Sequence, residues 1–145
     1  MRPPDSLRVV LAVRRLKEEA EERTLAALRQ QIQQAAAEAE RLQAELASVT
    51  ASRLEEVHCL LDGGHYQRSD ARYRQAQAQR SDALSQIAKL EKMRVEQMVI
   101  YLAARCGREV ISELQEQRMA AYQADLRVRE QKRNEELFLS RRARG

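Results

Sequence analysis

The chain has little of what a compact globular core is built from. It has no tryptophan, one phenylalanine and four tyrosines among its 145 residues. A compact domain of this length normally buries more large apolar side chains to offset the entropy lost on ordering. Both prolines lie at positions 3 and 4, so the remaining chain carries no proline that could break a helix. These absences argue against a globular domain and favour long helices.

Cysteine pairs and long apolar runs are also missing. The two cysteines, Cys59 and Cys106, have no spacing typical of a disulfide framework or a metal site. No apolar run approaches the roughly 18 residues of a membrane span, and no signal-peptide core follows the N-terminus. We therefore expect a cytoplasmic protein without a transmembrane helix.

What the chain does contain is typical of coiled coils. Ala, Glu, Lys, Leu and Arg account for 82 of the 145 residues. The net charge of +4 is modest, and its arginines alternate with glutamates. This pattern suits the solvated surface of a helix better than a nucleic-acid groove, for which we would expect a basic patch with aromatic residues.

The stretch from Leu25 to Leu60 carries the clearest pattern. Apolar residues follow one another at alternating steps of three and four, as in a helix that wraps around another helix: Leu25, Leu28, Ile32, Ala35, Ala39, Leu42, Leu46 and Val49. Only one face of such a helix can be buried, so it needs a partner. The partner could be the second half of the chain, another copy, or a different protein.

The first turns carry a different stripe, formed by Val9, Val13, Leu16 and Ala20. Asp5 or Ser6 can cap the helix after the prolines, so a first helix is expected over residues 6–61. The stripe of its first turns is one phase away from the Leu25 stripe. The sequence therefore predicts that the buried seam slips between Glu21 and Thr24.

Asp62-Gly63-Gly64 is the only strong helix breaker inside the chain. It predicts a turn over 62–68 and a second helix over 69–141, capped by Ser69 and Asp70. The second helix has a weaker stripe, which Arg80 and Arg94 interrupt: Tyr73, Ala76, Ala83, Ile87 and Leu90. The expected fold is all-α, a single antiparallel two-helix coiled coil over residues 1–145 with a C-terminal helical overhang.

A hairpin centred near residue 65 sets the expected register. Leu42 should then face the region of Ala88, and Leu28 that of Leu102. Cys59 and Cys106 would lie roughly 50 Å apart along the helices, too far for a disulfide. The first helix would cover the second only to about residue 124. Residues 125–145, with seven basic and four acidic side chains, would have no internal partner.

The densest apolar segment runs from Val95 to Cys106 and covers nearly the whole circumference of the helix. It could be a thickened core opposite Leu25 and Leu28. It could also be a docking surface for another protein, since a two-helix hairpin buries only one stripe. The residues concerned are Met98, Val99, Ile100, Tyr101 and Leu102.

No constellation of residues indicates catalysis, because a two-helix hairpin has almost no concavity in which reactive groups converge. His58, Cys59, Asp62 and His65 cluster near the turn, but their spacing fits no established metal site. There is no phosphate-binding glycine loop either. The sequence therefore predicts a non-enzymatic protein with no cofactor and no metal.

The chain opens with Leu7-Arg8 and continues with a glutamate-rich first helix, a turn near the middle and a longer second helix. Over most of its length this pattern resembles the FliJ family of flagellar type III export proteins and, more loosely, the YscO family of virulence secretion systems. The resemblance is most specific near the end of the chain. Leu114-Gln115-Glu116-Gln117-Arg118, followed by Ala121-Tyr122, is similar to the leucine, charged and tyrosine run of that family. Residues 130–137, Glu-Gln-Lys-Arg-Asn-Glu-Glu-Leu, resemble its acidic-Gln-Lys block, with Glu135 where the family most often has aspartate.

The resemblance implies a stalk-like coiled coil whose chain ends enter the central hole of a hexameric export ATPase. It also implies contact with the cytoplasmic domain of the membrane export gate, an escort role toward export chaperones, and a peripheral position at the inner membrane without insertion. The residues that match the ATPase-facing block are Glu130, Gln131, Lys132, Glu135, Glu136 and Leu137. The alternatives are a virulence-type stalk protein and a homodimeric coiled-coil spacer.

Overall fold

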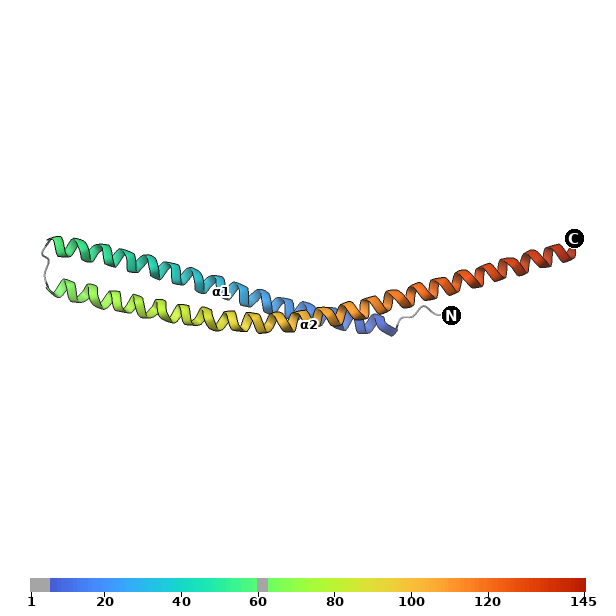
Figure 1. Ribbon diagram of the computed structural model, residues 1–145, viewed down its shortest axis with the longest axis horizontal. Helices are drawn as coiled ribbons and strands as arrows, with labels where there is room; N and C mark the ends of the chain where they lie inside the picture. The colour runs from blue at the N-terminus through green and yellow to red at the C-terminus, as the bar shows by residue number, and fades with distance from the viewer. Residues whose placement is uncertain (1–5, 60–62) are drawn as a thin grey trace. The chain divides into compact units, whose positions relative to one another are not determined.

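The protein is an all-α helical hairpin, as the sequence predicts (Figure 1). The structure, a computed structural model, describes residues 6–59 and 63–145, and the side chains of residues 56–66 lie outside this description. Helix α1 spans Ser6–Cys59 and helix α2 spans Gly63–Arg144. The two helices pack against each other, and no strand occurs among the described residues.

The helix ends differ slightly from the expected ones. Helix α1 ends at Cys59 and α2 begins at Gly63, so residues 63–68 of the expected turn are helical and Asp62 lies outside the described residues. Glycine is well tolerated at the first positions of a helix, where the amides have no intrahelical partner. At the other end α2 continues to Arg144, and the Gly145 amide donates to the Arg141 carbonyl at 3.1 Å. The basic side chains of this last turn stabilise the helix, because they lie at the negative end of its dipole.

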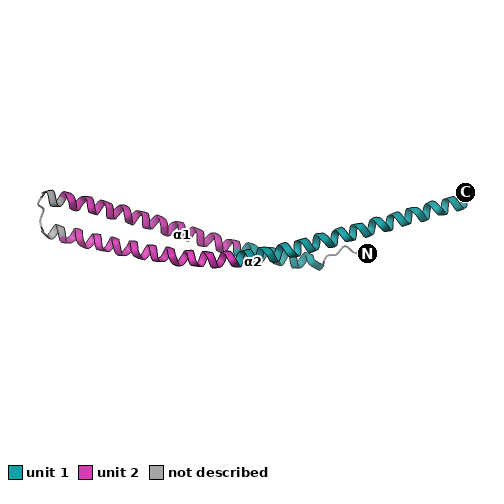
Figure 2. Ribbon diagram, viewed as in Figure 1, with its two compact units in different colours: residues 1–21, 100–145 teal, residues 22–99 magenta. Residues whose placement is uncertain are grey.

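The chain divides into two compact units (Figure 2). Unit 1 contains residues 1–21 and 100–145, and unit 2 contains residues 22–99. Each unit therefore holds a piece of α1 and a piece of α2.

The seam of α1, its line of contact with α2, follows steps of three and four without interruption from Leu7 to Arg53. Every residue at these steps is buried or half-buried except Arg14. The fully buried members are Leu11, Leu25, Leu28, Ala39, Leu42, Leu46 and Val49, and Leu42 is the most buried at 1% exposed. The prediction for the stretch from Leu25 to Val49 is therefore confirmed.

The seam of α2 has the same repeat from Ser69 to Gln115, and all its members are at least half-buried. Ala76, Leu90, Gln97 and Ala104 are fully buried. Arg80 and Arg94 do not interrupt this seam. Both are half-buried, because the apolar stem of a long arginine side chain can pack at the seam while its charged group reaches water. The Arg94 Nε atom, for example, donates to Glu91 Oε2 at 2.8 Å.

The predicted slip of the seam is wrong. Val9, Val13 and Leu16 are 70%, 59% and 65% exposed, whereas Leu7 is half-buried and Leu11 is buried. The facing seam of α2 keeps its seven-residue repeat through unit 1, so α1 keeps the matching repeat as well. Glu18 and Glu21 occupy the seam positions that a slip would have given to apolar residues.

The predicted register is also wrong, by a few residues. Side-chain contacts join Ser6 to Arg118 and Glu18 to Arg108 in unit 1, and Arg53 to Asp70 in unit 2, so the residue numbers of facing positions add to 124, 126 and 123. The midpoint is therefore near residue 62, between the end of α1 and the start of α2, and not at residue 65. In this register Leu42 lies level with about residue 82 rather than Ala88, and Leu28 lies level with about residue 96 rather than Leu102.

Candidate interaction surfaces

The last 19 residues of the chain, 127–145, form the C-terminal segment, and every one of them is exposed. The segment remains helical to Arg144. Leu126 is the last residue that is half-buried. The expected overhang is thus present, and it begins within two residues of the expected position.

The six residues that match the ATPase-facing block all lie in this exposed helix. At 3.6 residues per turn, Glu130, Gln131, Lys132, Glu135, Glu136 and Leu137 point in directions spread around the full circumference. A flat partner can reach only one side of a helix. A protein that contacts all six side chains must therefore surround the segment.

Local pairing within the C-terminal segment is sparse. The Gln131 Nε2 atom donates to Glu135 Oε1 at 3.4 Å, and Arg129 pairs with Asp125 at 3.2 Å between Nη2 and Oδ2. Both are exposed pairs one turn apart, which stabilise a helix only slightly. These side chains are available to another protein at small cost.

Three apolar residues near the end of the chain belong to the same surface. Leu137, Phe138 and Leu139 are all more than half exposed. Phe138 shares a helix face with Glu130, Gln131, Asn134 and Glu135. Sequence reasoning missed Phe138 and Leu139, although the only phenylalanine of the chain in a charged segment was a signal that could have found them.

The sequence left two interpretations of the apolar segment around residue 100, a thickened core and a docking surface. The structure supports each of them for a different part of the segment. Met98 and Tyr101 are half-buried, and Tyr101 occupies a seam position. Val99, Ile100 and Leu102 are exposed. Part of this segment therefore belongs to the core, and the other part is free to contact a partner.

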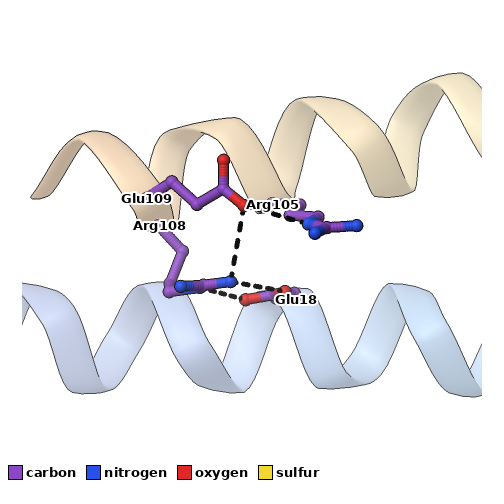
Figure 3. A network of polar contacts seen from close by, with 4 residues as sticks. All are labelled: Glu18, Arg105, Arg108 and Glu109. Carbon is purple, nitrogen blue, oxygen red and sulfur yellow. Dashed lines mark hydrogen bonds and ion pairs between the residues drawn. The ribbon is translucent and has the colours of Figure 1, made fainter. Parts of the chain in front are cut away.

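A polar network occupies the seam of unit 1 (Figure 3). Arg108 of α2 donates to both carboxylate oxygens of Glu18 on α1, at 2.7 Å from Nε and 3.3 Å from Nη2. Arg105 Nε donates to Glu109 Oε1 at 3.0 Å, and Arg108 also approaches Glu109 at 3.9 Å. This fork geometry fixes the two helices at one register.

The network shifts the pKa values of Glu18 and Arg108. The hydrogen bonds from Arg108, together with the positive charges of Arg108, Arg105 and Arg15, lower the pKa of Glu18 below its ordinary value, against a smaller effect of burial. The same hydrogen bonds raise the pKa of Arg108. The pair is therefore ionised at neutral pH.

Neither a metal site nor a membrane span is found in the part of the chain that the structure describes. No three His, Cys, Asp or Glu side chains there are grouped to hold a metal ion. The side chains of His58, Cys59, Asp62 and His65 are outside that part. None of the described helices is long and apolar enough to cross a membrane.

Comparisons with protein-family models, with curated proteins and with solved structures find no match to this chain.

Proposed function

We propose that the protein is a non-enzymatic, stalk-like component of a flagellar type III protein export apparatus. In this proposal the C-terminal segment enters the central hole of a hexameric export ATPase. The exposed part of the segment around residue 100 contacts the cytoplasmic domain of the export gate or an export chaperone. The gate then holds the protein at the cytoplasmic face of the inner membrane.

One observation carries the proposal. The residues that resemble the ATPase-facing block lie on an exposed single helix and point in all directions around it. A ring is a partner that can contact such a set. The mixed charge of the segment, with seven basic and three acidic side chains in residues 127–145, also suits a polar channel better than a flat apolar interface.

The contact can be tested by substitution. Replacing Gln131, Lys132, Glu135 and Glu136 together with alanine should abolish stimulation of the cognate ATPase, measured as phosphate release. A matched control replaces one glutamine, one lysine and two glutamates that are exposed in unit 2: Gln34, Lys89, Glu40 and Glu96. The control should stimulate as the parent protein does. Equal stimulation by both variants would show that these four residues do not contact the ATPase.

A second test asks whether the partner surrounds the helix. Alanine at Gln131 and Glu135 changes one side of the segment, and alanine at Lys132 and Glu136 changes another. A ring predicts that each pair alone weakens binding to the ATPase. Loss confined to one pair would indicate a partner that lies against a single face.

Two other functions stay open. The virulence-type stalk protein would use the same segment with a different ATPase, so reconstitution with both ATPases separates it from the flagellar one. A homodimeric spacer would pair its Leu25 to Leu60 seam with another copy, in place of the contact with α2. Equilibrium sedimentation separates it, because the stalk is a monomer in isolation and the spacer is a dimer.

A further inference from the structure

The outer face of the first three turns of α1 is apolar although it contacts no other helix. Val9, Val13 and Leu16 lie at steps of four and three on the side away from the seam, and all three are more than half exposed. Ala12, Ala20 and the partly exposed Val10 widen this stripe. We call residues 9–20 of this face the outer stripe.

The charge around the first part of the outer stripe, up to Lys17, has one sign, and Glu18 and Glu19 follow it. Residues 6–17 contain Arg8, Arg14, Arg15 and Lys17 and no acidic residue. Arg8 and Arg15 lie on one side of the stripe and Lys17 on the other, at 3.6 residues per turn, and all three are exposed. The first part of α1 is thus a basic amphipathic helix on the outside of the hairpin.

Of these cations, Arg8 lies in the first turn of α1, where a positive charge does not stabilise the helix. The N-terminal end of a helix carries a partial positive charge, so basic residues there lower its stability and acidic ones raise it. The first turn of α1 has no acidic residue. An external anionic surface would relieve this repulsion.

The shape and length of the outer stripe favour a lipid surface over a protein as its partner. The outer stripe is a convex ridge, whereas a helix that binds another protein usually enters a groove. It covers less than two heptads and ends at Ala20, among the acidic residues 18–22, and a coiled-coil partner needs about three or four heptads. Two copies that met through this face would also bring their arginines together.

We propose that the outer stripe of α1 lies on an anionic lipid surface, with the valines and leucine in the interfacial region and the flanking arginines and lysine at the headgroups. Long basic side chains can reach the headgroups while their stems contact the apolar layer. This goes beyond the proposed function, in which the gate protein alone holds the chain at the membrane. The helix would lie in the plane of the interface and not cross it.

The test uses the full chain and protein-free vesicles, so it is independent of the ATPase and of the gate. Binding is measured by flotation with vesicles of equal parts phosphatidylglycerol and phosphatidylcholine, and with vesicles of phosphatidylcholine alone. We expect at least about tenfold stronger binding to the anionic vesicles, decreasing with added salt. Equal binding to both, or to neither, would overturn the proposal.

Two variants separate the apolar and the ionic contributions. Val9→Ser with Val13→Ser and Leu16→Ser removes the apolar stripe, and Arg8→Gln with Arg15→Gln and Lys17→Gln removes the charges. Each should weaken vesicle binding about tenfold or more. These side chains are exposed, so circular dichroism should show unchanged helix content.

Each variant has a matched control in which the same residue types change elsewhere. Val95→Ser with Val110→Ser and Leu84→Ser removes two valines and a leucine that are exposed outside the outer stripe. Arg29→Gln with Arg72→Gln and Lys92→Gln removes the same charge from other exposed positions. Both controls should bind vesicles as the parent does.

Three other outcomes contradict the proposal. Parent-like vesicle binding by the serine variant would show purely electrostatic attraction without an embedded stripe. Weakening by the control variants to the same extent would show that the whole surface, and not this face, attracts lipid. Lipid-free dimerisation that depends on Val9, Val13 and Leu16 would identify the face as an interface between copies.

Discussion

Unit 2 and unit 1 distribute the same residue types in opposite ways. Unit 2 buries eight apolar side chains, and unit 1 buries two, Leu11 and Ala104, among the described residues. Unit 1 instead has Glu18, Glu21 and Arg108 on its seam and most of the exposed large apolar residues on its outside. Unit 2 therefore has most of the buried apolar core, whereas unit 1 leaves more of its apolar surface exposed to possible partners.

The ion pairs of the two units illustrate the same difference. In unit 2 Arg53 pairs with Asp70 and lies over the ring of Tyr73 at 4.9 Å, at the end of an apolar seam. In unit 1 the Glu18–Arg108 pair replaces apolar contacts within the seam. This half-buried ion pair stabilises less than well-packed apolar residues would, and its two-point geometry favours one register. The two helices of unit 1 are thus held in register although few apolar side chains pack between them.

The largest expected difference between regions is in amide hydrogen exchange. The C-terminal segment is a single exposed helix without a packing partner, and such helices are marginal in water. We expect its amides to exchange on the order of 100-fold faster than those of residues 25–49. Protection in residues 127–145 equal to that of residues 25–49 would show that the segment is not a free helix. Protection that rises when the ATPase is added would support the proposed contact.

The next largest effect is on stability. Leu42→Ala removes the most buried side chain of unit 2 and should lower the free energy of unfolding by about 2–4 kcal/mol. Leu16→Ala in unit 1 is its matched control, because Leu16 is a seam candidate by sequence but is exposed, and should cost less than about 0.5 kcal/mol. Urea unfolding measures both. Equal losses would place Leu16 in the core and restore the predicted slip.

The smallest expected effect concerns pH. Hydrogen bonds from Arg108 lower the pKa of folded Glu18, so its ionised form stabilises the fold above the unfolded pKa of about 4.3, and this contribution is lost as the pH falls through the lowered pKa. Glu18→Gln should therefore be less stable than the parent at pH 7 by less than the Leu42→Ala effect. The two proteins should converge in strong acid. A difference that persists below that pKa would show that the carboxylate charge is not the cause.

Much of the fold could be predicted because it follows from local chemistry. Two glycines in an otherwise helix-forming chain indicate one reversal, and the Leu25 to Val49 stripe indicates which face is buried. The exposed C-terminal segment follows from the unequal helix lengths. The candidate site was identified less completely, because Phe138 and Leu139 belong to no resembling block.

The register and the orientation of α1 in unit 1 could not be predicted in this way. The hairpin midpoint depends on where each helix ends, and a shift of a few residues changes every facing pair. The first turns of α1 carry two stripes, Leu7 with Leu11 and Val9 with Val13, and their sequence alone favours the longer one.

The sequence by itself determined that the chain forms two helices, that they fold back on each other, and that one ends in an unpaired segment. Its helix propensities, glycines and apolar spacing suffice for this because they act within single helices. Only the tertiary structure decided which stripe of residues 6–21 faces α2. The seam of α2 keeps one repeat throughout, and the Glu18–Arg108 pair lets α1 follow it, so the outer stripe remains exposed.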